Sequence, residues 1–253
     1  RGLKVIRAFS TSQLAFTVSD MATATELARP TARRLLLTLE QLGYVRSHEG
    51  LYMLTPQILD LGMSYITAQG MWDIARPHLE SLVSRTKESS SMSQLDGSDI
   101  VYTARVSVPK IIGLSVQIGT RFPVIATSMG HVLVSEMSAK QLDEVLSTPS
   151  QSRVIPRVKH TRKELNVTLA EVRSRGWALS DEQLSFGIRS IAAPVRDASG
   201  VIIAAVNVTV NAAETPLSKL RSSHLPLLLE TAQRITDDFV RMSQVPAVEV
   251  APS

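Results

Sequence analysis

Few side chains in this sequence are placed to do catalytic chemistry. The five histidines stand at positions 48, 78, 131, 160 and 224, without an HExxH pair or a spacing typical of zinc ligands. No G-x-S-x-G elbow, Walker loop or G-x-G-x-x-G motif occurs. Asp181 and Glu182 are adjacent carboxylates, but neighbours on a strand point to opposite faces, so paired acid–base catalysis is not supported. The sequence therefore predicts no enzyme, no metal site and no cofactor.

Two stretches instead combine small and polar residues as ligand sites do. The first runs from Gly119 to His131, where a helix is expected to begin. Backbone N–H groups at a helix start favour an anion such as a carboxylate, although a simple N-cap by Thr127 or Ser128 explains the same residues. The second is residues 180–190, SDEQLSFGIRS, followed by a strand on which Asn207 and Thr209 share one face. On so apolar a strand they need a partner, whether water, backbone or ligand.

Ser128 and His131 leave a different class of protein open. A serine and a histidine this close could serve a small-acid-binding enzyme of the hydrolase type, with an accessory DNA-binding domain. No third group or oxyanion signature accompanies them, so this interpretation remains an alternative.

The helix expected over Arg29–Tyr44, RPTARRLLLTLEQLGY, organises the N-terminal part. Its apolar residues recur at three- and four-residue steps. Arg29, Arg33 and Arg34 crowd its first turns, where positive charge is unfavourable against the helix dipole. A nearby polyanion explains them; a solvated basic end on a core helix is the alternative.

The segments on either side of this helix favour the interpretation that its arginines face a polyanion. Thr17 or Ser19 can cap a short helix upstream, after a first helix at Gly2–Phe9. Downstream, residues 44–46 and 51–54 alternate like two strands around a turn at residues 47–50. Helix, turn, helix and hairpin together predict a winged helix-turn-helix, whose second helix enters the DNA major groove.

Charge placement agrees with this prediction. Net charge is +4 over 253 residues, and the first 46 residues hold seven basic against three acidic side chains. A basic N-terminal module on a neutral body is typical of a DNA-binding protein. No apolar run approaches the roughly 20 residues of a membrane helix, no signal peptide is evident, and cysteine is absent, which excludes disulfides and fits a cytoplasmic protein.

The remaining segments predict an antiparallel sheet covered by helices, an α+β domain. Thr55-Pro56 should start a linker helix, whose apolar stripe suits either a second subunit or the chain itself; its members are Leu59, Gly62, Met63 and Ile66. Helices are expected at residues 73–87, 129–137, 139–146, 162–175 and 217–242. Pro77 should either lie near the first turn of its helix or kink that helix, and Pro226 is a position where the last helix can bend. Strands are expected at residues 92–95, 100–106, 111–117, 189–196 and 201–210. The predicted domains are 1–55, the linker 56–71, 72–245, and a disordered tail 246–253.

Taken together, these segments resemble the IclR family of bacterial transcription regulators over nearly the whole chain. The resemblance rests on RGLKVIRAFS, TARRLLLTLEQLGYV, YMLTPQILDLG, GTRFPVIATSMGHVL, GWALSDEQLSFGIRSIAAPVRDASG and IIAAVNVTV, in this order and spacing. Within the family, the chain looks most like the regulators of aromatic-acid catabolism through the β-ketoadipate pathway.

The resemblance implies a GAF-like effector domain, dimers that pair into tetramers, and operator binding tuned by a small organic acid. We expect DNA contacts from Arg29, Thr31, Arg33, Arg34 and His48, with Arg33 on a base and Arg34 on phosphate. The implied effector residues are Ile111, Leu114, Phe122, Ser128, Met129, Ile188, Ser190, Asn207 and Thr209, with Asp181 close by; Arg105 is added as a possible carboxylate partner. The effector is expected to be an aromatic hydroxy acid or an aliphatic oxo-dicarboxylate, its carboxylate at the helix start and its far end at Asn207 or Thr209.

Three positions depart from the family pattern. Glu26 stands where the helix-turn-helix turn commonly has glycine, which puts the turn geometry in question. Pro30 removes one backbone donor to phosphate. His131 replaces a usual lysine or arginine, which weakens the case for a fixed positive charge there.

Overall fold

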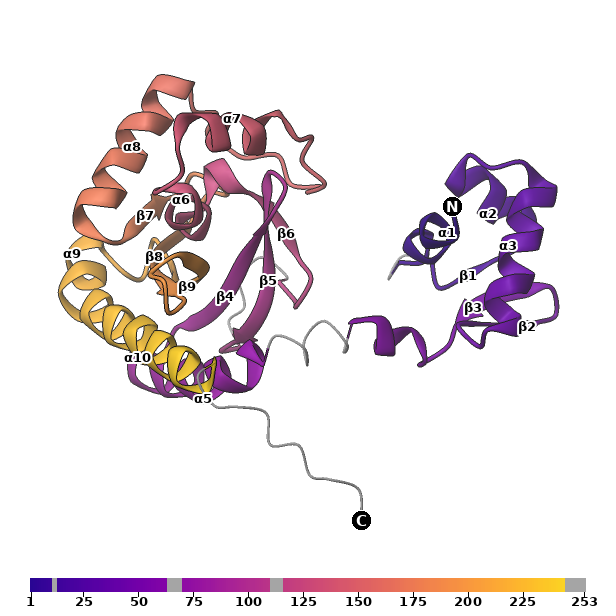
Figure 1. Ribbon diagram of the computed structural model, residues 1–253, viewed down its shortest axis with the longest axis horizontal. Coiled ribbons are helices and arrows are strands. Elements are labelled where there is room, and N and C mark those ends of the chain that lie inside the picture. The colour runs from indigo at the N-terminus through magenta and orange to yellow at the C-terminus, as the bar shows by residue number, and fades with distance from the viewer. Residues whose placement is uncertain (11–12, 63–69, 110–115, 244–253) are drawn as a thin grey trace, which may run out of the picture. The chain divides into compact units, whose positions relative to one another are not determined.

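The computed structural model describes residues 1–10, 13–62, 70–109 and 116–243, and the chain divides into two compact units, Arg1–Gln69 and Gly70–Ser253. Each unit has a hydrophobic core of its own. Figure 1 shows the elements of both. In the part of the chain that the structure describes, no helix is long and apolar enough to cross a membrane.

The N-terminal unit is a winged helix-turn-helix. Its helices are α1 (Gly2–Ala8), α2 (Val18–Thr25) and α3 (Arg29–Gln41), and its strands are β1 (Ala15–Phe16), β2 (Val45–His48) and β3 (Leu51–Leu54). The sheet has the antiparallel order β1-β3-β2, with β2 and β3 paired around Glu49-Gly50. The short strand β1 was not predicted, because two residues are too few for an alternating pattern.

The turn between α2 and α3 keeps its shape without glycine. Thr17 caps α2 through the backbone N–H of Asp20, and the helix ends at Glu26. Glu26 adopts the left-handed conformation, with φ 53° and ψ 34°, and its carboxylate pairs with Lys4 at 3.1 Å. The glycine-like geometry is therefore present, at a cost of about 1–2 kcal/mol for a residue with a Cβ.

The predicted linker helix is only partly described. Residues 58–62 are helical, which agrees with a start just after Thr55-Pro56. Leu59 is 65% exposed, and among the described residues nothing beyond the adjoining backbone lies within 4 Å of where a Cβ on Gly62 would be. Met63 and Ile66, the rest of the predicted stripe, lie outside the described residues.

The C-terminal unit is built on one six-stranded antiparallel sheet of order β6-β5-β4-β9-β8-β7. The strands are β4 (Ser89–Asp96), β5 (Asp99–Val106), β6 (Arg121–Pro123), β7 (Ala178–Asp181), β8 (Ile188–Arg196) and β9 (Ile202–Asn211). The helices are α5 (Met71–Thr86), η1 (Val124–Ala126), α6 (Ser128–Val134), α7 (Ala139–Ser147), α8 (Arg162–Arg175), α9 (Leu217–Lys219), η2 (Leu220–His224) and α10 (Leu225–Ser243).

Helices cover both faces of this sheet. Helices α5 and α10 lie side by side on one face, where they pack on residues such as Ile191 and Val206. Helices α6 and α8 cover the other face through a second cluster that includes Tyr102 and Ala192. Because strand neighbours alternate, Asn207 belongs to the α6 face while Val206 and Val208 face α10. The predicted α+β class is thus confirmed.

Several predicted boundaries need correction. The strand expected at residues 111–117 lies mostly outside the described residues, and residues 116–117 are not in a strand. Pro77 lies inside α5, which excludes the first-turn alternative and leaves the expectation of a kink as a prediction. The expected terminal helix is interrupted by η2, a π-helical turn in which the N–H of Leu225 donates to the carbonyl of Leu220. Pro226 follows at once and has no N–H for a regular helical bond, which accounts for the irregularity.

Candidate functional site

The outer face of α3 is a cationic surface that the protein leaves uncovered. Ala32, Leu36 and Leu39 bury its inner face, while Arg29, Arg33 and Arg34 are exposed. None of the three arginines forms an ion pair with any residue that the structure describes. A shallow hollow runs along this face, lined by Pro30, Arg33, Arg34, Leu37, Thr38 and Gln41. Spacings of three and four place these residues in one row, as a helix in a DNA groove requires.

The other two predicted DNA contacts lie on α3 itself and on the β2–β3 hairpin. Thr31 is half-buried in the first turn of α3, and His48 lies at the end of β2 with its side chain 78% exposed. The nearest carboxylate to His48 is that of Glu49, at 3.9 Å.

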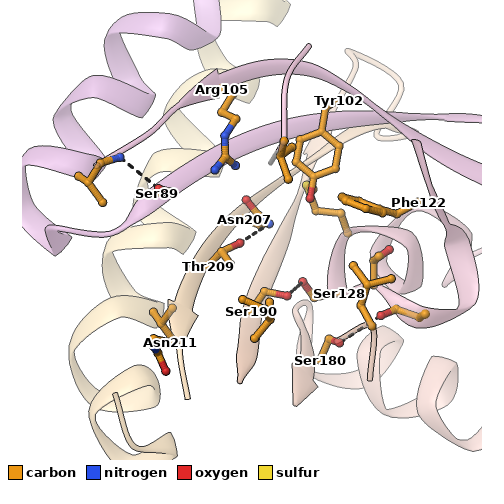
Figure 2. Close-up of a pocket in the computed structure, with 18 residues that line it drawn as sticks. Ser89, Tyr102, Arg105, Phe122, Ser128, Ser180, Ser190, Asn207, Thr209 and Asn211 are labelled. Carbon is orange, nitrogen blue, oxygen red and sulfur yellow. Dashed lines mark hydrogen bonds between the residues drawn. The ribbon is translucent and has the colours of Figure 1, made fainter. Parts of the chain in front are cut away.

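In the C-terminal unit, a cavity of about 280 Å³ lies between the sheet and the start of α6. Figure 2 shows the side chains that point into it from β4, β5, β8, β9 and α6. The apolar members of the wall are Val108, Val116, Phe122, Ala126, Met129, Leu184, Ile188 and Val210. The polar members are Ser89, Tyr102, Arg105, Thr127, Ser128, Ser180, Ser190, Asn207, Thr209 and Asn211.

The strand register explains why these polar side chains meet. One row runs across the sheet through Arg105, Ser91 and Asn207, which are paired on β5, β4 and β9. A second row, two residues along, runs through Ser89, Thr209, Ser190 and Ser180. Residues two apart on a strand share a face, so both rows form one polar floor beneath α6.

Arg105 is the cation of this floor. Its guanidinium donates a hydrogen bond to the Ser91 hydroxyl at 2.9 Å and has no carboxylate partner among the described residues. Burial lowers the pKa of Arg105 from its ordinary value, but a guanidinium remains protonated in proteins. A half-buried cation without an acid favours an anionic ligand.

Tyr102 and Asn207 continue the same end of the cavity. Burial raises the pKa of Tyr102 to about 12, so that its hydroxyl keeps its proton. The Asn207 amide donates to the Thr209 hydroxyl at 3.0 Å, and its carbonyl oxygen accepts from the Ser91 backbone N–H at 3.0 Å. Asn207 is therefore fixed in orientation by its neighbours, and it is only 3% exposed.

Three serines form the other end of the floor. The hydroxyl oxygens of Ser128 and Ser190 are 2.8 Å apart, and Ser180 donates to the Ala126 carbonyl at 3.2 Å. Figure 2 shows this group separated from Arg105, with Asn207 and Thr209 between Arg105 and Ser190.

The start of α6 depends on close packing. Thr127 caps the helix by accepting from the backbone N–H of Gly130 at 3.0 Å. A Cβ on Gly130 would lie 2.0 Å from the carbonyl oxygen of Val124, so no other residue fits without moving the backbone. The small residues of this segment thus serve N-capping and packing, in addition to any contact with a ligand.

Eight of the eleven predicted effector residues line this cavity: Arg105, Phe122, Ser128, Met129, Ile188, Ser190, Asn207 and Thr209. Ile111 and Leu114 lie outside the described residues. Asp181 does not line the cavity. Its neighbour Ser180 faces inward, so strand alternation turns Asp181 away, and its carboxylate pairs with Arg189 at 2.6 Å.

Sequence reasoning missed three polar contributors, Ser89, Tyr102 and Asn211, together with the inward orientation of Ser180. The sequence does not show that β4 lies beside β9, and this non-local pairing brings Ser89 next to Thr209. Tyr102 lies three residues before Arg105 on β5, so regular alternation would place the two side chains on opposite faces. An irregularity in the pairing of β4 with β5, at Met92 and Ser93, brings both into the cavity, and no pattern in the sequence shows it.

The hydrolase alternative has no geometric support. Ser128 is paired with Ser190, and the Nε2 of His131 lies 2.8 Å from the carbonyl oxygen of Ile125, to which it donates. Burial lowers the pKa of His131 to about 4. Across the described ranges, no three His, Asp or Glu side chains gather as metal ligands.

Comparison with known proteins matches each of the two units to a family model. Residues 1–49 match the family model described as the IclR helix-turn-helix domain, and residues 63–237 match the bacterial transcriptional regulator IclR C-terminal model. The chain is 35% identical to the Pca regulon regulatory protein of Pseudomonas putida, over 92% of this chain and 80% of the relative. It is 31% identical to the p-hydroxybenzoate hydroxylase transcriptional activator of Acinetobacter baylyi, over 93% and 89%.

Solved structures share the fold. A protein from Rhodococcus sp. RHA1, described as a candidate transcriptional regulator, is 45% identical, covers 96% of this chain and 97% of its own, and has a TM-score of 0.84. The inducer-binding domain of the PobR transcription factor from Acinetobacter, a double mutant in complex with 3-hydroxybenzoic acid, is 29% identical over 65% of this chain and 97% of its own, with a TM-score of 0.58.

Proposed function

Because the chain belongs to the IclR family of bacterial transcriptional regulators, we propose that it controls a catabolic operon by binding operator DNA through α3 and a small carboxylic acid in the α6 cavity. Membership of a family of transcriptional regulators also confirms the expectation that the chain is not an enzyme. A regulator of chromosomal operons acts in the bacterial cytoplasm, which is where we place this protein.

The observation that carries the effector assignment is Arg105. A cation held at the cavity wall, without an acidic partner in the described part of the chain, supports an acid as ligand. The apolar wall and the few converging polar groups are typical of a small-molecule site. The relatives named for the Pca regulon and for p-hydroxybenzoate hydroxylase, and the relative bound to 3-hydroxybenzoic acid, support an acid from aromatic catabolism.

The DNA assignment rests on the exposed arginines of α3. Arg33 is in the middle of the outer row and can reach a base edge, whereas Arg34 is proposed to hold a phosphate. Thr31, Arg29 and His48 are proposed to contact the backbone on either side. Exposed arginines in one row on a recognition helix supply the charge that non-specific affinity needs.

We further propose that the DNA-binding unit is a dimer, and that effector domains pair dimers into tetramers. One winged helix contacts only a few base pairs, which is too little to select one operator in a genome. Two related by a two-fold axis require a roughly palindromic site, with recognition helices about 34 Å or a multiple apart. The exposed Leu59, with Gly62 beside it, supplies an apolar seam for this pairing; Met63 and Ile66 would extend it.

The test is a fluorescence-anisotropy titration of the full chain on its own promoter DNA, with hydroxybenzoates and dicarboxylic acids added one at a time. At least one acid should change operator affinity about 5- to 150-fold, the usual range of allosteric coupling. The proposal fails if no acid changes the affinity and none binds at millimolar concentration.

A further inference from the structure

The two most exposed large apolar side chains in the described part of the chain lie on one surface of the C-terminal unit. Ile155 is 81% exposed and Phe186 is 78% exposed. They come from different loops, but Arg157, two residues after Ile155, places its guanidinium 6.0 Å from the centroid of the Phe186 ring. A single exposed apolar residue is ordinary on a protein surface, whereas neighbouring large ones mark a contact site.

Ile155 belongs to a segment, residues 151–160, that runs between α7 and α8 outside any helix or strand (Figure 1). Exposure alternates along this segment: every second residue is exposed, and the residues between them are half-buried. Such alternation presents one row of side chains to solvent, as on one face of a strand. The exposed row includes Arg153, Ile155, Arg157 and Lys159, and together with Phe186 we call it the Ile155–Phe186 surface.

The segment is held at both ends. At its start the buried carboxylate of Asp99 accepts from the Ser150 hydroxyl at 2.6 Å and from the Gln151 backbone N–H at 2.7 Å. Near its end the backbone N–H of Val158 donates to the Gln183 carbonyl at 3.0 Å, which joins the segment to the other loop of the surface. The exposed side chains are therefore presented by an anchored backbone, which lowers the entropy cost of binding a partner.

The Ile155–Phe186 surface is cationic. Arg153, Arg157 and Lys159 are exposed, and none of them pairs with a carboxylate among the residues that the structure describes. The Arg157 guanidinium donates to the backbone carbonyl of Glu182 at 3.2 Å and lies beside the Phe186 ring, which fixes its direction. Unpaired cations around exposed apolar side chains fit a partner segment that carries both carboxylates and apolar side chains.

DNA and a second copy of this chain fit the surface less well. Phosphates would occupy the cations but would leave both apolar side chains exposed. A two-fold contact between copies would bring the same cations toward one another across the interface. A protein segment with acidic and apolar side chains uses both features, and aromatic and arginine residues are the usual centres of protein contacts.

The surface adjoins the wall of the effector cavity in two places. Leu184 lines the cavity, and its carbonyl accepts from the Arg157 backbone N–H at 3.3 Å. Phe122 also lines the cavity, and it contributes to a separate hollow of about 320 Å³ that Arg153 borders. A partner bound here lies one residue contact away from the effector, as a protein that responds to the effector requires.

We propose that the Ile155–Phe186 surface binds RNA polymerase, through a segment of that enzyme that carries acidic and apolar side chains. This inference rests on the proposed function, because a regulator bound at an operator has to act on the enzyme that transcribes the operon. Ile155 and Phe186 provide the apolar contacts. Arg153, Arg157 and Lys159 provide the cations with which the acidic side chains pair.

The experiment measures the affinity of the full chain for immobilised RNA polymerase holoenzyme, purified from the bacterium that carries the gene, by biolayer interferometry without DNA. The wild type should bind at micromolar concentration, and binding should weaken as salt rises, because exposed charge pairs are screened. Ile155→Ser and Phe186→Ser should each weaken binding about tenfold, as the loss of an apolar anchor at an interface does. Arg157→Glu should weaken it at least as much and reduce its dependence on salt.

Two exposed positions of the same unit serve as matched controls. Val201→Ser removes an apolar side chain that is 57% exposed in the turn between β8 and β9, at the opposite end of β8 from Phe186. Lys140→Glu reverses an exposed cation on α7. Both variants should bind the polymerase as the wild type does. Operator affinity should stay unchanged in every variant, because none of the substituted residues belongs to the DNA-binding unit.

The outcomes separate the inference from the proposed function. A holoenzyme that does not bind the wild type, or that binds Ile155→Ser and Phe186→Ser with wild-type affinity, would overturn the inference and leave operator and acid binding in place. Weaker binding of random DNA by Arg157→Glu would make the surface a DNA contact, and altered sedimentation of Phe186→Ser would make it a contact between copies; either would overturn the inference. Failure of the proposed function would appear separately, as a wild type whose operator affinity no acid changes.

Discussion

The Arg105 guanidinium and the Ser91 hydroxyl, 2.9 Å apart on neighbouring strands, form the only hydrogen bond that the structure gives to this cation within its described residues. Ser91 in turn donates its backbone N–H to Asn207, so the cation is attached to a fixed polar row rather than to an acid. A site arranged in this way is prepared for a carboxylate, because the ligand completes the ion pair.

The arginines of α3 should separate base recognition from phosphate binding. Arg33→Ala should cost about 1–3 kcal/mol on the operator and relax specificity at one position. Arg34→Ala should weaken operator and random DNA alike and reduce the slope of affinity against salt. Anisotropy titrations at several salt concentrations measure both. Unchanged affinity and slope in Arg33→Ala would mean that another element recognises the bases.

Gly130→Ala should destabilise the C-terminal unit by more than about 2 kcal/mol, because the new methyl group would lie 2.0 Å from the Val124 carbonyl oxygen. Both tryptophans, Trp72 and Trp177, belong to this unit, so denaturant unfolding followed by tryptophan fluorescence reports on it. Lys140→Ala, at an exposed position of α7 in the same unit, is the control and should not lower stability. Wild-type stability in Gly130→Ala would contradict the packing at the start of α6.

His131 should make the C-terminal unit sensitive to acid. Burial lowers the pKa of His131 from 6.5 to about 4, so its neutral form stabilises the folded state fully above pH 6.5. As pH falls toward 4 the unfolded chain takes up the proton first, and stability should fall by up to about 3 kcal/mol. Tryptophan-monitored unfolding from pH 7 to 4 should show this loss, and His131→Gln should reduce it. The same pH dependence in the variant would assign it to other groups.

Leu59→Glu should lower operator affinity more than tenfold while leaving acid binding unchanged. A charge on this exposed position would oppose the pairing of two linker helices. A single winged-helix unit makes too few contacts with DNA for tight binding. Sedimentation velocity with and without operator measures the assembly. Normal operator affinity in a variant that sediments as a monomer would exclude this seam.

Local signals in the sequence predicted the long elements well. Helix α8 matches residues 162–175 because Thr161 and Glu164 form a capping box and Gly176 ends the helix in the left-handed conformation. Strands β6 and β7 were missed because they are short and, unlike β2 and β3, are not joined to their partner strands by a tight turn that would mark a hairpin. Glu26 was mispredicted for a different reason. A glutamate in place of glycine suggested an altered turn between α2 and α3, but the surrounding helices impose the left-handed conformation on Glu26.

The candidate site was predictable where it depends on a single strand. Asn207 and Thr209 share a face by alternation, and the structure places both on the cavity floor. Ser89 required the order of the sheet, which no local pattern contains. Asp181 was placed near the site by resemblance, although the alternation that brings Ser180 inward turns Asp181 toward Arg189.

The central claim is that the acid and the operator are coupled through this chain, and thermodynamic linkage tests it most directly. The dissociation constant of the best-binding acid should be measured by calorimetry on the free protein and again on the protein saturated with operator duplex. The account predicts that operator changes the affinity for acid by the same factor, and in the same direction, as the acid changes the affinity for operator. An identical dissociation constant with and without operator would contradict it.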